Sequence, residues 1–197
     1  MKLLLLALLL IFQSPSTFKS TEKEFEDEIE LENWYKEDGL SNCILPEASS
    51  SSNLKAFKEI TYIAENANEG SLENAWIEGN PDYGIGESIE FIYHNTMYEN
   101  QIFEIDGVFI LNGYYKTKEL WEENSRVKKF KLFINGELSG IIELIDTRNP
   151  QFVELPQITI KYNIETRIKF EIVDIFKGSK YKDTAVTSFK FTGSGCN

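Results

Sequence analysis

Aromatic and polar side chains gather in one stretch from Ala75 to Phe91, AWIEGNPDYGIGESIEF. Its rings could stack on the C–H face of a pyranose, and its carboxylate oxygens could accept hydrogen bonds from sugar hydroxyls. A second stretch, Asn112 to Arg126, repeats these side-chain types. Together the two stretches predict a glycan-binding site formed by Trp76, Glu78, Tyr83, Asn112, Tyr114, Asn124 and Arg126.

The same residues also have a structural interpretation. Trp76 could be a core residue of a β-rich protein. Arg126 could pair with Glu87 or Asp146 and hold loops together instead of binding a sugar. The sequence leaves both interpretations open.

Catalytic chemistry has little support. His94 is the only histidine, so no histidine metal triad can be assembled, and a Ser-His relay would have to rest on this one residue. Paired carboxylates such as Glu78, Asp82 and Glu87 could serve a glycosidase, but acidic residues are common along the whole chain. We therefore expect no catalytic residues.

The elements that must position these residues have the pattern of strands. Residues 167–175 alternate polar and apolar positions, and Asn135-Gly136 is typical of a tight hairpin turn. Gly107 interrupts another strand and suggests a β-bulge. About eight short strands with turns between them, and little helix, predict an all-β protein with an antiparallel β-sandwich.

The N-terminus resembles an export signal. Met1-Lys2 is followed by an apolar run, Leu3 to Phe12, that is too short for a stable membrane anchor. We expect a signal peptide over residues 1–16, with cleavage near Ser16 or Thr17. The protein would then be secreted or periplasmic, with no transmembrane segment in the mature chain. Residues 17–42 are interpreted as an acidic, solvated spacer with a short helix as an alternative, and residues 43–197 as one domain.

Charge and cysteine content narrow the partners and the compartment. A formal net charge of -12 argues against nucleic acid or an anionic membrane surface as the main partner. Cys43 and Cys196 lie near the two ends of the patterned region, and in an oxidising compartment they could close the domain with a disulfide. Two free thiols are the alternative.

Several spaced motifs occur in the order found in one family of domains. They are ASSS at Ala48–Ser51, NANEGSLENAW at Asn66–Trp76, AWIEGNPDYGIGESIEF at Ala75–Phe91, NGYYK at Asn112–Lys116, NSR at Asn124–Arg126 and KGSKYKDTAVTSFKF at Lys177–Phe191. The first two resemble the opening of discoidin (factor V/VIII type C) domains. The full series resembles the NAD glycohydrolase-type glycan-binding domain, which stands N-terminal in streptococcal NAD glycohydrolase. The resemblance covers roughly Cys43 to Cys196.

The resemblance implies a galactose-binding-like jelly-roll sandwich that recognises carbohydrate at a rim of loops. In that family the domain accompanies a separate catalytic domain, for which this chain has no room after Cys196. We therefore expect a secreted, non-catalytic carbohydrate-binding module whose partner is a glycan or a glycosylated surface. A protein-interaction or adhesion module on the same fold, and a small glycoside- or NAD-processing enzyme, remain as alternatives.

Calcium is a further question that the resemblance raises. Many discoidin-like sugar binders hold Ca²⁺ through an Asp-Gly in the first loop and a Glu near the C-terminus. Here Glu69-Gly70 and Ser188 stand at those places, so both expected ligands are replaced. We expect no required cofactor or metal, with Asn66, Glu69 and Ser71 as the residues that could still hold calcium.

Overall fold

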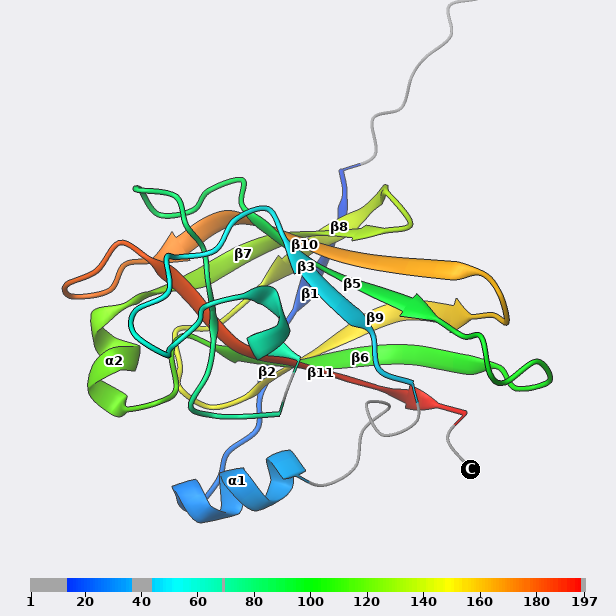
Figure 1. Ribbon diagram of the computed structural model, residues 1–197, viewed down its shortest axis with the longest axis horizontal. Coiled ribbons are helices and arrows are strands. Elements are labelled where there is room, and N and C mark those ends of the chain that lie inside the picture. The colour runs from blue at the N-terminus through cyan, green and yellow to red at the C-terminus, as the bar shows by residue number, and fades with distance from the viewer. Residues whose placement is uncertain (1–13, 37–43, 69, 196–197) are drawn as a thin grey trace, which may run out of the picture.

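A computed structural model describes residues 14–36, 44–68 and 70–195 of the chain (Figure 1). The strands are β1 (Ser16–Lys19), β2 (Thr21–Glu22), β3 (Glu47–Ser50), β4 (Trp76–Ile77), β5 (Ser88–His94), β6 (Phe103–Asn112), β7 (Ser125–Ile134), β8 (Glu137–Glu143), β9 (Gln151–Ile160), β10 (Glu165–Phe176) and β11 (Thr184–Ser194). The helices are α1 (Glu28–Lys36), α2 (Lys118–Glu123) and the short 3-10 helix η2 (Ala64–Ala67).

The strands form one sheet that folds over on itself as a sandwich. Hydrogen bonding follows the order β2-β9-β6-β11-β7-β10-β5-β3, while β8 adds to β7, β1 to β8 and β4 to β11. The two halves meet where β11 runs briefly parallel to β7, at the pairs Thr184–Ser125 and Ala185–Arg126. Most other neighbours are antiparallel, so the predicted all-β, jelly-roll sandwich is confirmed.

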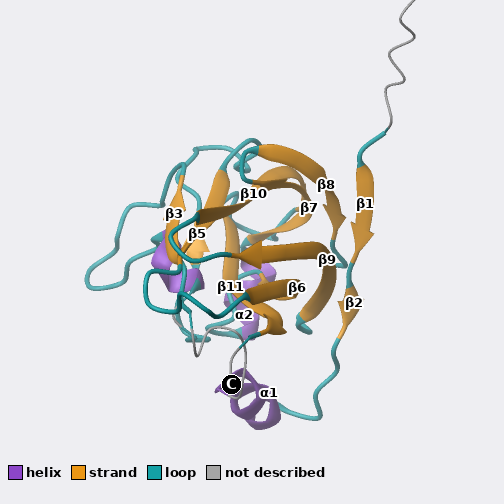
Figure 2. Ribbon diagram, turned by 90° about the vertical axis from the view of Figure 1, so that its right-hand side faces the viewer, coloured by secondary structure: helices purple, strands orange, loops and turns teal. Residues whose placement is uncertain are grey.

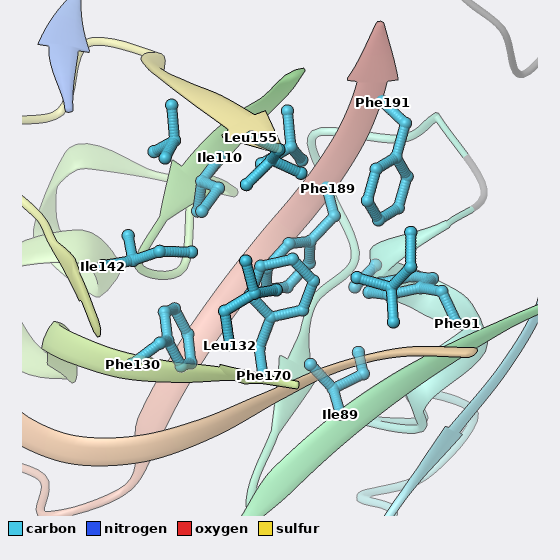
Figure 3. Close-up of a cluster of buried hydrophobic side chains, with 14 of the residues drawn as sticks. Ile89, Phe91, Ile110, Phe130, Leu132, Ile142, Leu155, Phe170, Phe189 and Phe191 are labelled. Carbon is cyan, nitrogen blue, oxygen red and sulfur yellow. The ribbon is translucent and has the colours of Figure 1, made fainter. Parts of the chain in front are cut away.

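The core between the two layers is rich in phenylalanine. Alternate residues of β5, β7, β10 and β11 point inward, and their side chains meet in one cluster (Figure 3). The rings of Phe170 and Phe189 lie 4.7 Å apart, and those of Phe91 and Phe191 lie 5.1 Å apart. Each buried aromatic side chain removes a large apolar area from water, which is the main favourable term in folding.

Two turn predictions are confirmed by the backbone. Asn135 and Gly136 have φ values of 51° and 85° and join β7 to β8, as a type I′ turn requires. The register between β6 and β9 shifts between Ile105 and Gly107, where the sequence predicts a bulge. Strand β9 runs unbroken from Gln151 to Ile160, with an irregular register around Pro156.

The acidic segment before residue 43 packs on the sandwich where it is described, which differs from the expected solvated spacer. β1 pairs in parallel with β8, and β2 pairs with β9, along one side of the molecule (Figure 2). Helix α1 buries Leu31 and packs Trp34 against Phe109, while Ile29 is 70% exposed. The alternative of a short helix in this segment is therefore confirmed, and its apolar side carries Leu31 and Trp34.

Several expectations concern residues outside the described ranges. Residues 1–13, which make up most of the predicted signal peptide, are among them, as are Cys43 and Cys196. The signal peptide and the disulfide therefore stay predictions. Within the described ranges, no helix is both long enough and apolar enough to cross a membrane.

Candidate functional site

Trp76 is a core residue. It lies in β4, opposite Val186 of β11, and its side chain is 0% exposed. Its indole N–H donates to the backbone carbonyl of Ser52 at 3.0 Å. Because neither face of the ring is open, the prediction that Trp76 stacks on a sugar is wrong. The alternative, that Trp76 is a core residue, is confirmed.

Glu78 is also buried, and it fastens the glycine-rich loop to β11. Its Oε1 accepts the backbone N–H of Thr184 at 3.0 Å, and its Oε2 accepts that of Asn80 at 2.7 Å. A side chain at Gly84, which has a φ of 68°, would collide with the Glu78 side chain. Burial raises the pKa of Glu78 above its ordinary value. The carboxylate thus accepts hydrogen bonds from backbone N–H groups, and the prediction that it binds sugar hydroxyls is wrong.

The raised pKa of Glu78 makes a testable contribution to stability. Since the folded state favours the protonated carboxyl, this contribution is fully present below the ordinary glutamate pKa of about 4.3 and is lost as pH rises through the folded value. Glu78→Gln should remove this dependence. The difference in unfolding free energy between wild type and Glu78→Gln, measured with urea across pH, should therefore shrink as pH rises. A difference independent of pH would contradict this assignment.

Asn112 ties one layer of the sandwich to the other. Its side-chain Nδ2 donates to the carbonyl of Val127 at 2.7 Å, and its Oδ1 accepts the N–H of Val127 at 3.0 Å. The amide thus imitates one residue of a strand and extends β6 toward β7. Both of its polar atoms are engaged and buried, so Asn112 has no group left for the predicted sugar contact.

Arg126 braces the loops at the same end of the sandwich. Its guanidinium donates to both carboxylate oxygens of Asp146, at 2.8 and 3.2 Å, and to the carbonyls of Trp121 and Asn124, at 2.9 and 3.0 Å. It also lies 4.1 Å from the centre of the Trp121 ring. The alternative pairing with Asp146 is therefore confirmed, whereas Glu87 instead accepts the hydroxyls of Ser51 and Ser52.

The remaining two buried members of the predicted site have structural roles as well. The amide of Asn124 donates to the carbonyl of Leu120 at 2.8 Å and closes the end of α2. Tyr114 packs in a small apolar cluster with Tyr62, and burial raises its pKa to about 12. The predicted sugar contacts of Asn124 and Tyr114 are therefore replaced by contacts within the protein.

Tyr83 alone among the seven keeps a partly exposed side chain. The ammonium groups of Lys177 and Lys182 lie 5.0 and 5.7 Å from the centre of its ring. Lys182 also pairs with Asp82 at 3.1 Å. Helix α2 and the β10–β11 loop lie at this end of the sandwich (Figure 1). Most of the predicted site residues there make contacts within the protein.

The candidate calcium ligands are only partly described. Asn66 is buried and donates its amide to the carbonyls of Thr61 and Ala75, at 2.7 and 3.0 Å. The Ser71 hydroxyl accepts the N–H of Glu73, while Glu69 lies outside the described residues. Among the residues that are described, no three His, Cys, Asp or Glu side chains are grouped to hold a metal ion. That no metal is required therefore stays a prediction.

A hollow that the sequence motifs do not predict lies on the outer face of β6, β9 and β11. Its volume is about 760 Å³, and it combines aromatic, acidic and uncharged polar residues. It is lined by Glu104, Asp106, Phe109, Phe152, Glu154, Leu155, Gln157, Thr192, Gly193 and Ser194. The rings of Phe109 and Phe152 are 4.9 Å apart at an angle of 47°, and both are partly exposed.

Backbone irregularities shape this hollow. The β6–β9 register shifts beside Gly107, and the β6–β11 register shifts between Thr192 and Gly193. A Cβ atom at Gly107 would lie 2.5 Å from the Phe152 ring, so the ring lies across β6 where there is no side chain. Asp106 falls at the shift, and its Oδ1 accepts the Thr192 hydroxyl at 2.7 Å. β-Bulges commonly redirect a side chain in this way.

The comparisons with known proteins decide the family. A family model described as the NAD glycohydrolase translocation F5/8 type C domain matches residues 34–192. The chain belongs to this family. Its fold is also similar to the C-terminal domain of a chitobiase from Bacteroides fragilis, with 13% identity and a TM-score of 0.48 over 81% of this chain and 100% of that one. No curated protein sequence matches.

The F5/8 type C match places the hollow within the family domain. β6 and β9 fall inside residues 34–192 and β11 extends two residues beyond, whereas β1, β2 and most of α1 precede the match. The sequence did carry a signal for the hollow. The outer side of β6, opposite the buried Ile105 and Ile110, carries Glu104, Asp106 and Phe109. This alternation predicts an aromatic ring on the outer face of the sheet.

Proposed function

We propose that this F5/8 type C domain is a secreted, non-catalytic carbohydrate-binding module and that the hollow over β6, β9 and β11 binds the glycan. One observation carries the proposal: a cavity of about 760 Å³ that brings two partly exposed rings together with carboxylate, amide and hydroxyl groups. Ligand sites are commonly concave, with an apolar floor and a few polar groups that fix orientation. The family name, which describes a translocation domain, agrees with a non-enzymatic role.

The lining residues offer complementary contacts to a sugar. Phe109 and Phe152 present ring surface to the C–H groups of a pyranose. Glu154 and Thr192 are both register partners of Gly107, so they stand on either side of the Phe152 ring. Carboxylate oxygens at such positions accept hydrogen bonds from neighbouring hydroxyls, while the Thr192 hydroxyl can also donate.

A glycan-array screen of the purified secreted chain tests the function, with calcium and again with chelator. We expect specific binding that is the same in both conditions. Phe152→Ala should weaken the best interaction about tenfold or more, since loss of 1.4 kcal/mol is a factor of ten. The matched variant Tyr83→Ala removes a partly exposed ring at the predicted rim and should leave binding unchanged.

Melting temperatures of both variants control for folding. Phe152→Ala and Tyr83→Ala must each keep a cooperative transition before their binding is compared. Binding that survives Phe152→Ala but is lost in Tyr83→Ala would place the glycan at the rim and contradict the proposed site. Absence of binding to any glycan by the folded wild type would contradict the function itself.

A second candidate function is a protein-interaction or adhesion module. A separate hollow of about 320 Å³ is lined by residues 44–45 and 94–98, and there Leu45 is 64% and Met97 is 76% exposed. Exposed apolar side chains of this kind can mark contact sites for other proteins. Recovery of one protein partner, insensitive to competing sugars and lost in Met97→Ser, would favour this function.

A further inference from the structure

The hollow has an unbalanced charge. Three carboxylates, those of Glu104, Asp106 and Glu154, line it, whereas none of its lining residues is basic. On β9, Glu154 pairs with Gly107 of β6. Glu104 and Asp106 both lie on β6 itself, two residues apart. A ligand lying on the Phe152 ring would therefore meet carboxylates from two neighbouring strands.

These carboxylates lack the basic partners that several others on the sandwich have. Glu143 and Glu171 pair with lysines at 2.8 and 2.9 Å, whereas the three acids of the hollow pair with no basic side chain among the described residues. Asp106 accepts only the Thr192 hydroxyl there. The negative charge of the hollow is thus left for a ligand to neutralise.

Two basic groups close to the Phe109 side of the hollow are directed at helix α1 instead. The ammonium groups of Lys23 and Lys190 lie 4.8 and 4.9 Å from the Trp34 ring, and Lys190 donates to the Trp34 carbonyl at 3.1 Å. Lys23 is also 6.0 Å from the centre of the Phe109 ring. Neither lysine lines the hollow, so they border its aromatic side without filling it.

We infer that the hollow selects glycans that carry free amino groups, such as deacetylated hexosamine oligomers; this rests on the proposed glycan-binding function. An ammonium group can pair with the carboxylates and also lie over a ring face, which attracts cations. A metal ion is a poorer occupant, because no three acidic side chains of the described residues are grouped to hold one. Sialylated or sulfated glycans would be repelled by the same carboxylates.

Titration calorimetry on the whole secreted chain tests this inference. The probes are N-acetylglucosamine hexamer and the fully deacetylated hexamer, which share length and linkage. We expect wild type to bind the deacetylated hexamer at least about tenfold more tightly, a ratio that corresponds to about 1.4 kcal/mol. Salt should weaken this preference, because it screens exposed charges.

Two isosteric variants remove the charge without removing the rings. Asp106→Asn and Glu154→Gln should each weaken binding of the deacetylated hexamer at least about threefold more than they weaken binding of the acetylated hexamer. Glu137→Gln is the matched control: it lowers the net negative charge equally but lies at the β7–β8 hairpin of the other layer, and should change nothing. Hexalysine serves as a cation that has no sugar ring.

The outcomes separate this inference from the proposed function. Equal binding of the two hexamers, or a preference for the acetylated form, would overturn the selectivity for amines and leave glycan binding intact. Equal competition by hexalysine, or an equal loss in Glu137→Gln, would overturn it as well, since charge alone would then explain the affinity. Failure of every glycan in both this titration and the array would overturn the proposed function with it.

Discussion

Replacing Trp76 with alanine should lower the free energy of unfolding by about 3–5 kcal/mol, the usual cost of deleting a fully buried aromatic side chain. The indole is 0% exposed and belongs to the main core cluster. Its removal would also leave the Ser52 carbonyl without the N–H that it accepts at 3.0 Å. The expected loss is therefore among the largest for any single substitution.

Guanidinium unfolding followed by far-UV circular dichroism measures this effect without relying on tryptophan emission. Tyr83→Ala is the control, because its ring is partly exposed, and it should cost less than about 1 kcal/mol. A Trp76→Ala variant that unfolds within 1 kcal/mol of wild type would contradict the core position of the ring. Glycan affinity measured on the folded fraction should be unchanged, since Trp76 does not line the hollow.

Replacing Arg126 with alanine should cost about 3 kcal/mol, because the carbonyls of Trp121 and Asn124 would lose the N–H groups that they accept inside the protein. Its guanidinium donates to the carbonyls of Trp121 and Asn124 and to both oxygens of Asp146. Arg126→Lys should recover little of the loss, since an ammonium cannot reproduce the planar fork that meets these acceptors.

Chemical unfolding of Arg126→Ala and Arg167→Ala compares a buried arginine side chain with an exposed one. Arg167 pairs with Glu90 and Glu165, but its side chain is 42% exposed. Its loss should cost no more than about 1 kcal/mol, as for most surface ion pairs. Similar losses for the two arginines would show that the Arg126 network contributes no more than a surface pair.

Much of the fold could be predicted because its signals are local and periodic. The turn at Asn135-Gly136 needs positive φ at both residues, which these two types tolerate, and the bulge at Gly107 needs a missing side chain. Helix α1 was harder. Its apolar side is formed by Leu31 and Trp34, and it is stabilised by packing on β6, a contact that local sequence spacing does not reveal.

The site could not be predicted in the same way because sugar-binding and loop-bracing residues are chemically alike. Glu78, Asn112 and Arg126 were expected to bind hydroxyls, and the structure gives each of them backbone partners instead. Residue type shows how many hydrogen bonds a side chain can make, but not with which partner. The hollow depends on three strands that are distant in sequence, so its residues had no common motif.

The most direct test is a crystal structure of the protein with the glycan that binds most tightly in the array. We predict that a sugar ring lies against Phe152, with polar groups of the sugar within hydrogen-bond distance of Asp106 or Glu154. A glycan ordered instead beside Tyr83 and the β10–β11 loop, with the hollow empty, would contradict the proposed site.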